Sequence, residues 1–419
     1  MVRVVDSIMG SGKTQATISY FNQNKDKLFI YITPYLDEAA RIVNGCPDLN
    51  FIEPVKGIKK YGYTKTGHIT HLIEQKKNIA STHQAFKRYS KETLNKIREY
   101  GYTLVIDEAV DTVEEAQEVA KGDIDVLVKA GYISVDDNNV CTRGEQKYKD
   151  GEAFKEIFTL LQSRHLIRVP QKNSDKTYYW TVPADLITAF QDVIVLTYLF
   201  KGQHLCHFFN IHGIEYTNLY VKLDSDGNYS FTENAEERNI PQYVYSLKDT
   251  IHICKDKKLN KIGQDYHDLS VTWFDTHPEK VRVLHSNLRS YFQYHHSESD
   301  SKDLLWSTYK DFEPKLKRKG YMKSCIALNA KATNEYRNRS VLAYCVNLFI
   351  PTPIRMFYRL YGIELDNDAY ALSTMVQWIW RSAIRDGKEV YLYLPSRRMR
   401  EILETWIDET QRTAKERNN

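Results

Sequence analysis

The sequence predicts an α/β protein with two domains, each built on a parallel sheet. Three observations support this prediction. Short apolar runs of strand length alternate with helix-like segments, first in the N-terminal half and again after about residue 301. The chain has 419 residues, which is too long for one ordinary hydrophobic core. Its content of 42% hydrophobic and 27% charged residues is typical of a globular protein and excludes a disordered one.

The first element is a strand that leads into a glycine-rich loop. Residues 2–5 form the mostly apolar strand, and the loop Ser7-Ile8-Met9-Gly10-Ser11-Gly12-Lys13-Thr14 follows before a helix-like segment. This order matches a phosphate loop, in which backbone N–H groups surround phosphates, a lysine reaches the β and γ oxygens, and a hydroxyl holds Mg²⁺. Ser7 stands where the usual signature has its first glycine. The alternative is an ordinary glycine-rich turn. We assign nucleotide binding to Gly10, Ser11, Gly12, Lys13 and Thr14, with Thr14 also at the metal.

Four further strands in the N-terminal half each end at polar residues. The runs 28–32, 78–81, 103–106 and 193–196 end in Thr33-Pro34, Thr82-His83, Asp107-Glu108 and Thr197, respectively. Parallel strands joined by right-handed crossovers bring their carboxyl ends to one sheet edge, where ligands bind in such folds. We therefore expect these polar residues to lie along the same edge as the phosphate loop.

Asp107 and Glu108 are two carboxylates at the end of a buried strand, where a metal ion would explain them. In phosphoryl transfer to water, one carboxylate organises Mg²⁺ and a neighbouring one orients the attacking water. Asp107 fits the metal role and Glu108 the general base. The alternative is a strand that runs into a helix capped by acidic residues.

The domain boundaries follow from changes in this pattern. We expect a first domain at residues 1–204 with an insertion at about 110–189, because a connection of that length is no simple loop. Residues 205–300 form an accessory or connecting region, and residues 301–419 form the second domain. The second domain is predicted to contain strands at 304–306, 325–328, 341–346 and 390–394.

A helix predicted over residues 369–384 carries the second informative motif. Gln377, Arg381 and Arg385 are spaced i, i+4, i+8 and would form one stripe on that helix. Two arginines at this spacing repel each other, and an anion such as a γ-phosphate would compensate that repulsion. The alternative is an amphipathic helix with a solvated basic face.

These motifs, taken in order, resemble the motifs of superfamily 2 helicases. The resemblance is carried by Lys13-Thr14, Thr33-Pro34, Thr82-His83, Asp107 to Val110, Leu196-Thr197, Ala332 to Tyr336 and Gln377 to Arg385. It spans nearly the whole chain and is strongest for the compact replication and recombination helicases of tailed bacteriophages. Trp380 stands where the family commonly has a glycine before the first arginine, and the fourth residue of the Asp-Glu-Ala-Val motif differs from the usual forms.

The resemblance implies two RecA-like P-loop NTPase domains that hydrolyse ATP with Mg²⁺ in a cleft between them. It implies that Lys13, Glu108, Gln377, Arg381 and Arg385 are catalytic, that Thr14 and Asp107 hold the metal, and that Thr197 couples hydrolysis to movement. It also implies that a single strand of DNA is contacted by Thr33, Pro34, Thr82, His83, Thr333 and Asn334. Other phage replication proteins are possible partners.

The expected function is therefore ATP-dependent unwinding or translocation on DNA in phage replication or recombination. Two alternatives stay open: a translocase or annealing ATPase that does not separate strands, and a P-loop kinase for nucleotides or small molecules. The six scattered cysteines suggest no zinc site, and the absence of a long apolar run predicts an intracellular location and no membrane partner. The resemblance to phage helicases implies that this location is the cytoplasm of a bacterial host.

The formal net charge of +4 is too small to identify a polyanionic partner. Local basic clusters are more informative, although each is more often a solvated face than a binding site. One of them comprises Lys315, Lys317, Arg318, Lys319 and Lys323.

Overall fold

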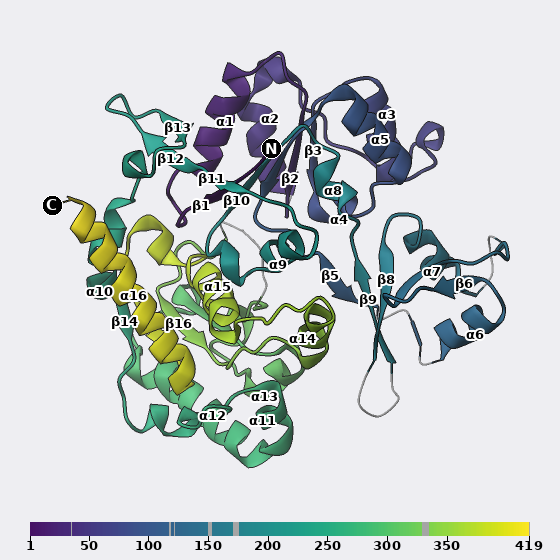
Figure 1. Ribbon diagram of the computed structural model, residues 1–419. Helices are drawn as coiled ribbons and strands as arrows, with labels where there is room; N and C mark the ends of the chain where they lie inside the picture. The colour runs from purple at the N-terminus through teal and green to yellow at the C-terminus, as the bar shows by residue number, and fades with distance from the viewer. Residues whose placement is uncertain are drawn as a thin grey trace. The chain divides into compact units, whose positions relative to one another are not determined.

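The computed structural model describes residues 1–34, 36–116, 119–120, 122–149, 153–170, 176–328 and 335–418. The chain forms two compact units, which are described separately. The first unit contains Met1–Ser7, Gly12–Arg238 and Pro351–Leu365, and the second contains Ile8–Ser11, Asn239–Ile350 and Asp366–Asn419. Each unit is built on a parallel sheet with helices packed against it (Figure 1), which confirms the predicted α/β fold class.

The sheet of the first unit has six strands in the order β11-β1-β10-β4-β2-β3, and its neighbouring strands run parallel. The strands are β1 (Val2–Asp6), β2 (Phe29–Thr33), β3 (Ile79–Thr82), β4 (Thr103–Asp107), β10 (Asp192–Thr197) and β11 (Thr217–Asn218). Five of them coincide with predicted apolar runs, because a parallel strand covered on both faces is apolar throughout its length. Strand β10 lies between β1 and β4, although β4 precedes it by more than eighty residues.

Helices cover both faces of this sheet, as Figure 1 shows. Helices α1 (Lys13–Gln23) and α2 (Leu36–Gly45) pack on one face, where the core includes Phe21, Tyr31 and Ile42. Helices α3 (Lys65–Glu74), α4 (His83–Phe86), α5 (Lys91–Tyr100), α8 (Asp185–Thr188) and α9 (His204–Ile211) contribute to the core on the other face. Helices α4 and α5 are separate, and α5 begins after its N-cap Ser90, whose hydroxyl accepts a hydrogen bond from the backbone N–H of Thr93.

The segment after β4 forms a separate antiparallel sheet in the order β5-β9-β8-β7-β6. Its strands are β5 (Val113–Glu115), β6 (Ile133–Val135), β7 (Val140–Arg143), β8 (His165–Pro170) and β9 (Lys176–Thr181), with α6 (Asp123–Lys129) and α7 (Lys155–Leu160) beside them. The run Tyr178-Tyr179-Trp180 belongs to β9 and is buried. These aromatic rings are therefore core residues of the inserted region.

The second unit contains a four-stranded parallel sheet in the order β14-β17-β16-β15. Three strands were expected from the sequence: β15 (Leu304–Ser307), β16 (Val341–Tyr344) and β17 (Val390–Tyr393). The edge strand β14 (Ile251–Ile253) was not, because it is only three residues long. The strand predicted at 325–328 is wrong: Cys325 makes only an isolated bridge to Trp306, and the carbonyl oxygen of Ile326 accepts a hydrogen bond from the Ser307 hydroxyl instead of continuing a ladder.

The helix that carries the second motif is shorter than predicted. Helix α15 (Asn367–Ile379) ends with Trp380 as its C-cap, and the short 3₁₀ turn Ala383–Asp386 follows. The Ser382 hydroxyl donates a hydrogen bond to the carbonyl oxygen of Ile379 at 2.6 Å, which replaces a helical partner for that carbonyl. Gln377, Arg381 and Arg385 therefore do not form one helical stripe.

The last helix, α16 (Arg397–Asn418), closes the second unit. It is the longest helix in the described part of the chain, and none of the helices there is long and apolar enough to span a bilayer.

Candidate nucleotide-binding site

The loop between β1 and α1 has the backbone conformation that a phosphate loop requires. Gly10 has φ of 77° and Gly12 has φ of 95°, a region that residues with a side chain rarely adopt. Gly12 is also the N-cap of α1. The backbone N–H of Ser11 donates to the carbonyl oxygen of Ile8 at 3.3 Å, which closes the turn. The amino end of α1, with the positive end of the helix dipole, therefore lies at the end of this loop.

Two loop hydroxyls are buried without a hydrogen-bond partner among the described residues. They are the Oγ atoms of Ser7 and Ser11, whose side chains are 4% and 1% exposed. A buried hydroxyl that makes no hydrogen bond destabilises the protein, so a ligand oxygen at this place would remove that cost. The Lys13 ammonium donates to the carbonyl oxygen of Ser7, so the cation is held over the same loop. The loop thus fits a phosphate group.

An aromatic ring closes one side of the loop. A Cβ atom placed on Gly12 would lie 2.1 Å from Cδ1 of Tyr229, in strand β13 (Tyr229–Thr232). Strand β13 pairs with β12 (Tyr220–Leu223), and the Phe231 ring of this hairpin lies 6.0 Å from the Tyr20 ring of α1. A side chain at position 12 would collide with Tyr229, so both the backbone angle and the packing require glycine there.

The acidic strand end lies two strands away from the loop. The register pairs Asp6 of β1 with Thr197 of β10, and Leu196 of β10 with Asp107 of β4. Thr197 therefore lies between β1, which leads into the loop, and the acidic strand β4, at the shared edge that the sequence predicted. Its hydroxyl donates to Oε1 of Gln203 at 2.7 Å, which fixes the side chain.

Asp107 is held by contacts that the sequence did not reveal. The Tyr31 hydroxyl donates to its Oδ2 at 2.7 Å, and Nε2 of the buried His83 lies 2.9 Å from its backbone oxygen. Burial, together with the nearby Glu108 carboxylate, raises the pKa of Asp107 to about 6, whereas the Tyr31 hydrogen bond and the Lys13 ammonium oppose that rise. Lys13 and Asp107 thus interact electrostatically, which brings the two predicted halves of the site together.

Glu108 has an unusual backbone conformation. Its φ is 59°, in the left-handed region, and its N–H donates to the carbonyl oxygen of Leu196 at 2.9 Å. A residue with a long side chain is strained there, and such strain concentrates at functional sites. Strand β4 therefore ends abruptly at the position to which the sequence assigns the general base.

The structure places the remaining predicted residues of the first unit at the same edge or beside it. Thr33 ends β2, is fully buried, and has an Oγ1 atom without a partner among the described residues. Thr82 ends β3 and is the N-cap of α4, whereas His83 points inward to Asp107. Pro34 follows β2 and is partly buried. The predicted contacts Thr333 and Asn334 lie outside the described residues.

In the second unit, Arg381 is buried at 7% exposure, and Gln377 and Arg385 are partly buried. They come from α15, the segment after it and the following 3₁₀ turn. Their local placement therefore differs from the single helical face that the spacing indicated.

The loop residues that belong to the second unit contact Tyr243, which in turn contacts Trp380. The Tyr243 hydroxyl donates to the carbonyl oxygen of Met9, and Nε1 of Trp380 donates to the Tyr243 oxygen at 3.1 Å. A Cβ atom on Gly10 would lie 3.5 Å from Cε1 of Tyr243. Nδ2 of Asn239 donates to the carbonyl oxygen of Ser11 at 2.9 Å. The turn of the loop is thus fixed by side chains far away in sequence.

No group of three or more His, Cys, Asp or Glu side chains in the described ranges could hold a metal ion by itself. Mg²⁺ in a phosphate-loop site takes only one or two protein ligands and completes its shell with water and substrate phosphates. Thr14, in the first turn of α1, and the Asp107 carboxylate are the residues available for it.

Comparisons with known proteins place these features in a family. Residues 245–407 match the family described as the YonV C-terminal Rossmann-like domain. The SPbeta prophage-derived uncharacterized protein YonV of Bacillus subtilis (strain 168) is 37% identical over 417 residues, which cover 97% of this chain and 98% of that protein.

Solved structures of XPD proteins show weaker similarity. Xpd4 of S. tokodaii has a TM-score of 0.44 at 14% identity and covers 97% of this chain and 94% of its own. A structure described as XPD helicase has a TM-score of 0.44 at 11% identity, with 96% and 94% covered. An apo XPD structure has a TM-score of 0.46 at 13% identity, with 94% and 92% covered.

Proposed function

The chain belongs to the YonV family, and we propose that it is a magnesium- and ATP-dependent nucleic-acid motor, in its simplest form a DNA helicase of phage replication or recombination. The observation that carries the nucleotide part is the pair of buried, unpartnered hydroxyls of Ser7 and Ser11 in a loop whose lysine interacts with Asp107. The ordered motifs supply the nucleic-acid part.

The residues of the first unit have distinct roles in this proposal. The loop N–H groups and Lys13 bind the β and γ phosphates, and Thr14 and Asp107 hold Mg²⁺, which neutralises phosphate charge when it is bound. Glu108 accepts the proton of the attacking water. Tyr31 keeps Asp107 oriented and favours its ionised form, because its hydroxyl donates to the carboxylate. Thr197 couples hydrolysis to movement.

The residues of the second unit complete the proposed reaction. Arg381 and Arg385 would stabilise the charge that develops on the γ-phosphate, since the planar guanidinium forms paired hydrogen bonds with phosphate oxygens. Gln377 would sense the nucleotide. Arg381 follows the end of α15 and Arg385 lies in the next 3₁₀ turn, so the proposal does not require the two arginines to share a helical face.

Nucleic acid is expected to stimulate ATP hydrolysis by the purified protein, and the stimulation should fall steeply as salt rises, because phosphate contacts release counterions. The measurement is the ATPase rate with single-stranded DNA, duplex, fork and RNA at several salt concentrations. Arg385→Ala should lower the turnover number more than it raises the KM for ATP. If nucleic acid leaves the hydrolysis rate unchanged at every salt concentration, or if phosphate is transferred to a small molecule, the result would favour a kinase instead.

Strand separation is a separate question from hydrolysis. A strand-displacement assay on a labelled fork, run under the conditions of greatest ATPase stimulation, distinguishes a helicase from a translocase or annealing ATPase. Displacement that requires hydrolysable ATP supports the helicase, whereas stimulated hydrolysis without displacement supports the other motor.

Tyr243→Phe is expected to raise the KM for ATP several-fold with little change in turnover number. The substitution removes the hydroxyl that holds the Met9 carbonyl and accepts from Trp380, so the loop loses a fixed conformation before the nucleotide binds. Trp380→Phe should have a similar effect, because Trp380 acts through the same hydroxyl. The double variant should then be no worse than either single variant, as expected for one connected network.

Tyr391→Phe is the matched control for this prediction, because it removes a partly exposed tyrosine hydroxyl whose contact with Glu389 is long, at 3.4 Å. Its KM should equal that of the wild type. Additive losses in the double variant, or an unchanged KM in Tyr243→Phe, would show that this pair does not position the loop.

A further inference from the structure

The second unit contains a cavity with an unusual charge. Its volume is about 380 Å³, and its lining includes the cationic side chains Lys302, Lys319, Lys323 and Arg339. No Asp or Glu side chain belongs to the described residues that line it. Cations gathered around one hollow repel one another and create a positive potential that attracts anions.

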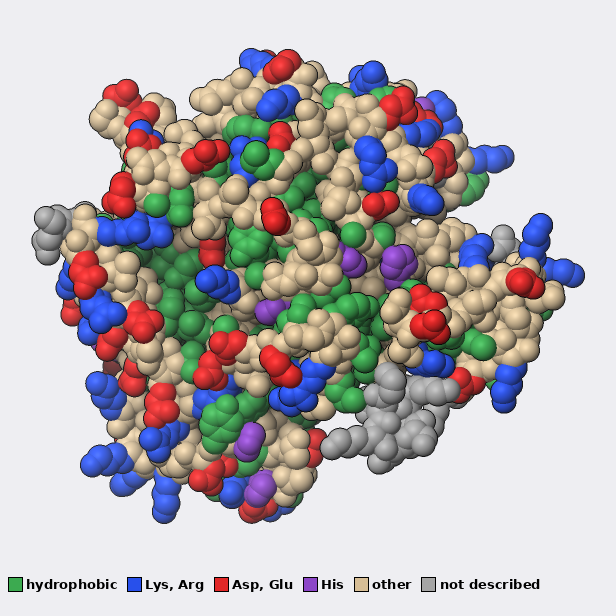
Figure 2. Space-filling view, viewed as in Figure 1, with side chains coloured by type: hydrophobic (Ala, Val, Ile, Leu, Met, Phe, Trp, Pro, Cys, Tyr) green, Lys and Arg blue, Asp and Glu red, His purple; other side chains and the backbone are tan. Residues whose placement is uncertain are grey.

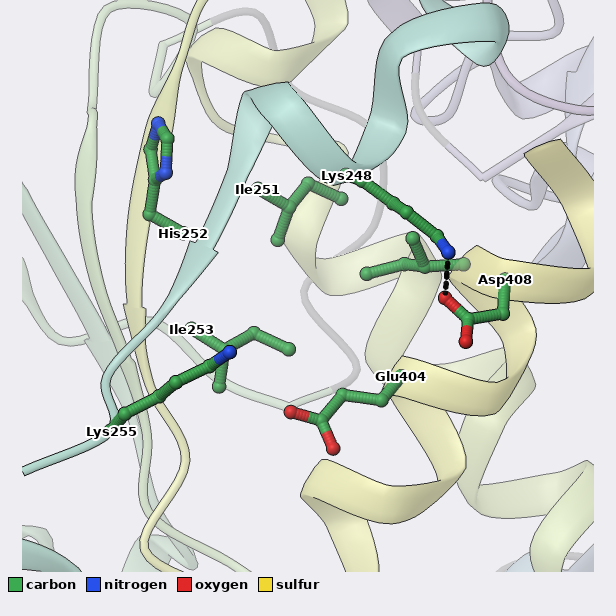
Figure 3. Close-up of a pocket in the computed structure, with 8 residues that line it drawn as sticks. Lys248, Ile251, His252, Ile253, Lys255, Glu404 and Asp408 are labelled. Carbon is green, nitrogen blue, oxygen red and sulfur yellow. Dashed lines mark ion pairs between the residues drawn. The ribbon is translucent and has the colours of Figure 1, made fainter. Parts of the chain in front are cut away.

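A second cavity of the same unit shows how differently cations can be arranged. It has a volume of about 530 Å³ and lies between β14 and α16 (Figure 3). There Lys248 pairs with Asp408 at 2.8 Å, and Figure 3 shows Glu404 directed into the same space as Lys255. Acidic side chains therefore compensate the positive charges of this cavity, which has no excess of cations that would attract an anion.

In the first cavity, acidic side chains compensate only part of the positive charge. Lys302 pairs with Asp300 at 3.1 Å, and a guanidinium nitrogen of Arg339 donates to the carbonyl oxygen of Ser301 at 2.6 Å. Lys319 and Lys323 are exposed and form no ion pair with another residue that the structure describes. Arg339 thus has a fixed position, while the two lysines present uncompensated charge.

Exposed side chains suited to stacking lie beside these cations. Met322 lines the cavity and is 45% exposed. Tyr294 is 64% exposed, lies in the π-helical turn Tyr291–His295, and has the Arg289 guanidinium 5.6 Å from its ring centroid. Single π-helical turns occur often at functional sites.

The turn with Tyr294 adjoins the cavity through Gln293. Its Nε2 donates to the carbonyl oxygen of Lys319 at 3.4 Å, and a Cβ atom on Gly320 would lie 3.2 Å from the same nitrogen. The pKa of His285 is lowered mainly by burial and also by the nearby charges of Arg318 and Arg289. The positive region therefore extends from the cavity onto α12 (Pro278–Ser290), and Figure 2 shows several Lys and Arg side chains along the lower margin where that helix lies.

The cavity does not lie where a ligand of a parallel sheet is expected. Lys302 precedes β15 and Arg339 precedes β16, so the cations stand at the amino ends of these strands. Ligands in such sheets usually bind beyond the carboxyl ends. The cations Lys302 and Arg339 thus lie at the ends of β15 and β16 opposite to the edge where a ligand is expected, and the sequence indicated only a basic cluster.

We propose that this surface, formed by Lys302, Lys319, Lys323 and Arg339 with Tyr294 and Met322, binds the phosphodiester backbone of single-stranded nucleic acid and stacks its bases. Cations that contact the backbone, beside an exposed ring that stacks a base, are a combination that suits single strands, because every base has a face to stack. An acidic protein segment would use the charge but not the exposed ring. The proposal deepens the proposed motor function and rests on it for nucleic acid as the substrate.

The test is fluorescence anisotropy with a labelled 20-nucleotide oligothymidine and no ATP, from 50 to 300 mM salt. The double variant Lys319→Glu/Lys323→Glu should bind at least tenfold more weakly at the lowest salt. The slope of log affinity against log salt should also become shallower by about 1.4, since each lost single-strand contact removes roughly 0.7. Tyr294→Ala should weaken binding at least fivefold without changing the slope, because stacking releases no counterions.

The control carries the same charge change elsewhere in the unit: Lys248→Glu/Lys415→Glu should bind like the wild type. Thermal melting of all variants shows whether they are folded. Unchanged affinity and slope in Lys319→Glu/Lys323→Glu, with a wild type that binds, would overturn this surface and leave the proposed motor standing. The single-strand assignment would be overturned if Lys319→Glu/Lys323→Glu lost binding to a duplex but kept binding to the oligonucleotide. It would also be overturned if polyglutamate displaced the oligonucleotide as readily as unlabelled DNA does. A wild type that binds no nucleic acid would overturn both proposals.

Discussion

Replacing Lys13 with alanine is expected to reduce ATP hydrolysis at least about 100-fold, the range found when one charge-stabilising group is removed from a transition state. The ammonium already lies over the phosphate loop, where it donates to the Ser7 carbonyl and interacts with Asp107. When a nucleotide binds, the same cation is available to the β and γ oxygens. Alanine leaves those charges without a partner in the loop, so both binding and turnover should suffer.

The control for this prediction is Lys25→Ala. Lys25 follows α1, is 54% exposed, and pairs with Asp48 on the surface. Surface pairs of this kind contribute about 0–1 kcal/mol, so the variant should hydrolyse ATP at the wild-type rate. Both proteins should melt within a few degrees of the wild type. Full hydrolysis by folded Lys13→Ala would remove the phosphate-loop assignment altogether.

The position of the candidate site in the first unit could be predicted from the sequence, because its residues directly follow apolar strands. Apolar runs predicted parallel strands, and the carboxyl ends of parallel strands share one edge, so Lys13, Thr197 and Asp107 could be assigned to the same place before their pairing was known. The register between β1, β10 and β4 then brings them together. Only the sheet order, with β10 between the other two, required the structure.

The contacts that tune the site could not be predicted in this way. Tyr31 is one aromatic residue in a buried strand, and no spacing connects its hydroxyl with Asp107, seventy-six residues later. Tyr243 lies in a 3₁₀ segment without periodicity, more than two hundred residues from Met9. Such pairs arise from the packing of distant segments. Two acidic residues at the end of a buried strand indicate that hydrogen-bond donors or cations lie nearby. The sequence pattern does not identify the residues that provide them.

The helix of the second motif was predicted too long for a different reason. Residues 380–384 contain no proline or glycine, so nothing in their composition ends a helix. In the structure, one tertiary contact and one local hydrogen bond lie at its end: Trp380 packs on Trp406 of α16 with ring centroids 5.5 Å apart, and the Ser382 hydroxyl donates to the carbonyl oxygen of Ile379. Packing of this kind overrides helix propensity, which is a weak preference of less than about 1 kcal/mol per residue.

Asp107→Asn is expected to have opposite effects on activity and stability. Hydrolysis should fall by at least about 100-fold, because the amide cannot provide the negative charge that Mg²⁺ needs in the proposed site. The same variant, measured in EDTA without nucleotide, should melt at a higher temperature than the wild type at pH 8. The amide oxygen still accepts the hydrogen bond of Tyr31, so the substitution removes charge and preserves shape.

The sign follows from the pKa of Asp107, which is raised from 3.8 to about 6 by burial and by Glu108. A carboxyl group whose pKa is raised on folding binds its proton more tightly in the folded state, so its ionisation destabilises that state. The cost grows as pH rises from about 4 to about 6 and is constant above that range. At 1.36 kcal/mol for each pH unit it amounts to roughly 3 kcal/mol, or on the order of 5 °C in melting temperature.

The advantage of Asp107→Asn should therefore be largest at pH 7–8 and disappear at pH 4, where the wild-type carboxyl group is protonated in the folded protein. Melting curves of both proteins across this range provide the measurement, and Asp48→Asn is the control because its carboxylate is exposed on the surface. Equal melting temperatures at pH 8 would show that the Asp107 carboxylate is not strained in the metal-free protein. A higher melting temperature together with lost hydrolysis would mean that the chain retains, at a cost in stability, a charge useful only when magnesium and a nucleotide bind.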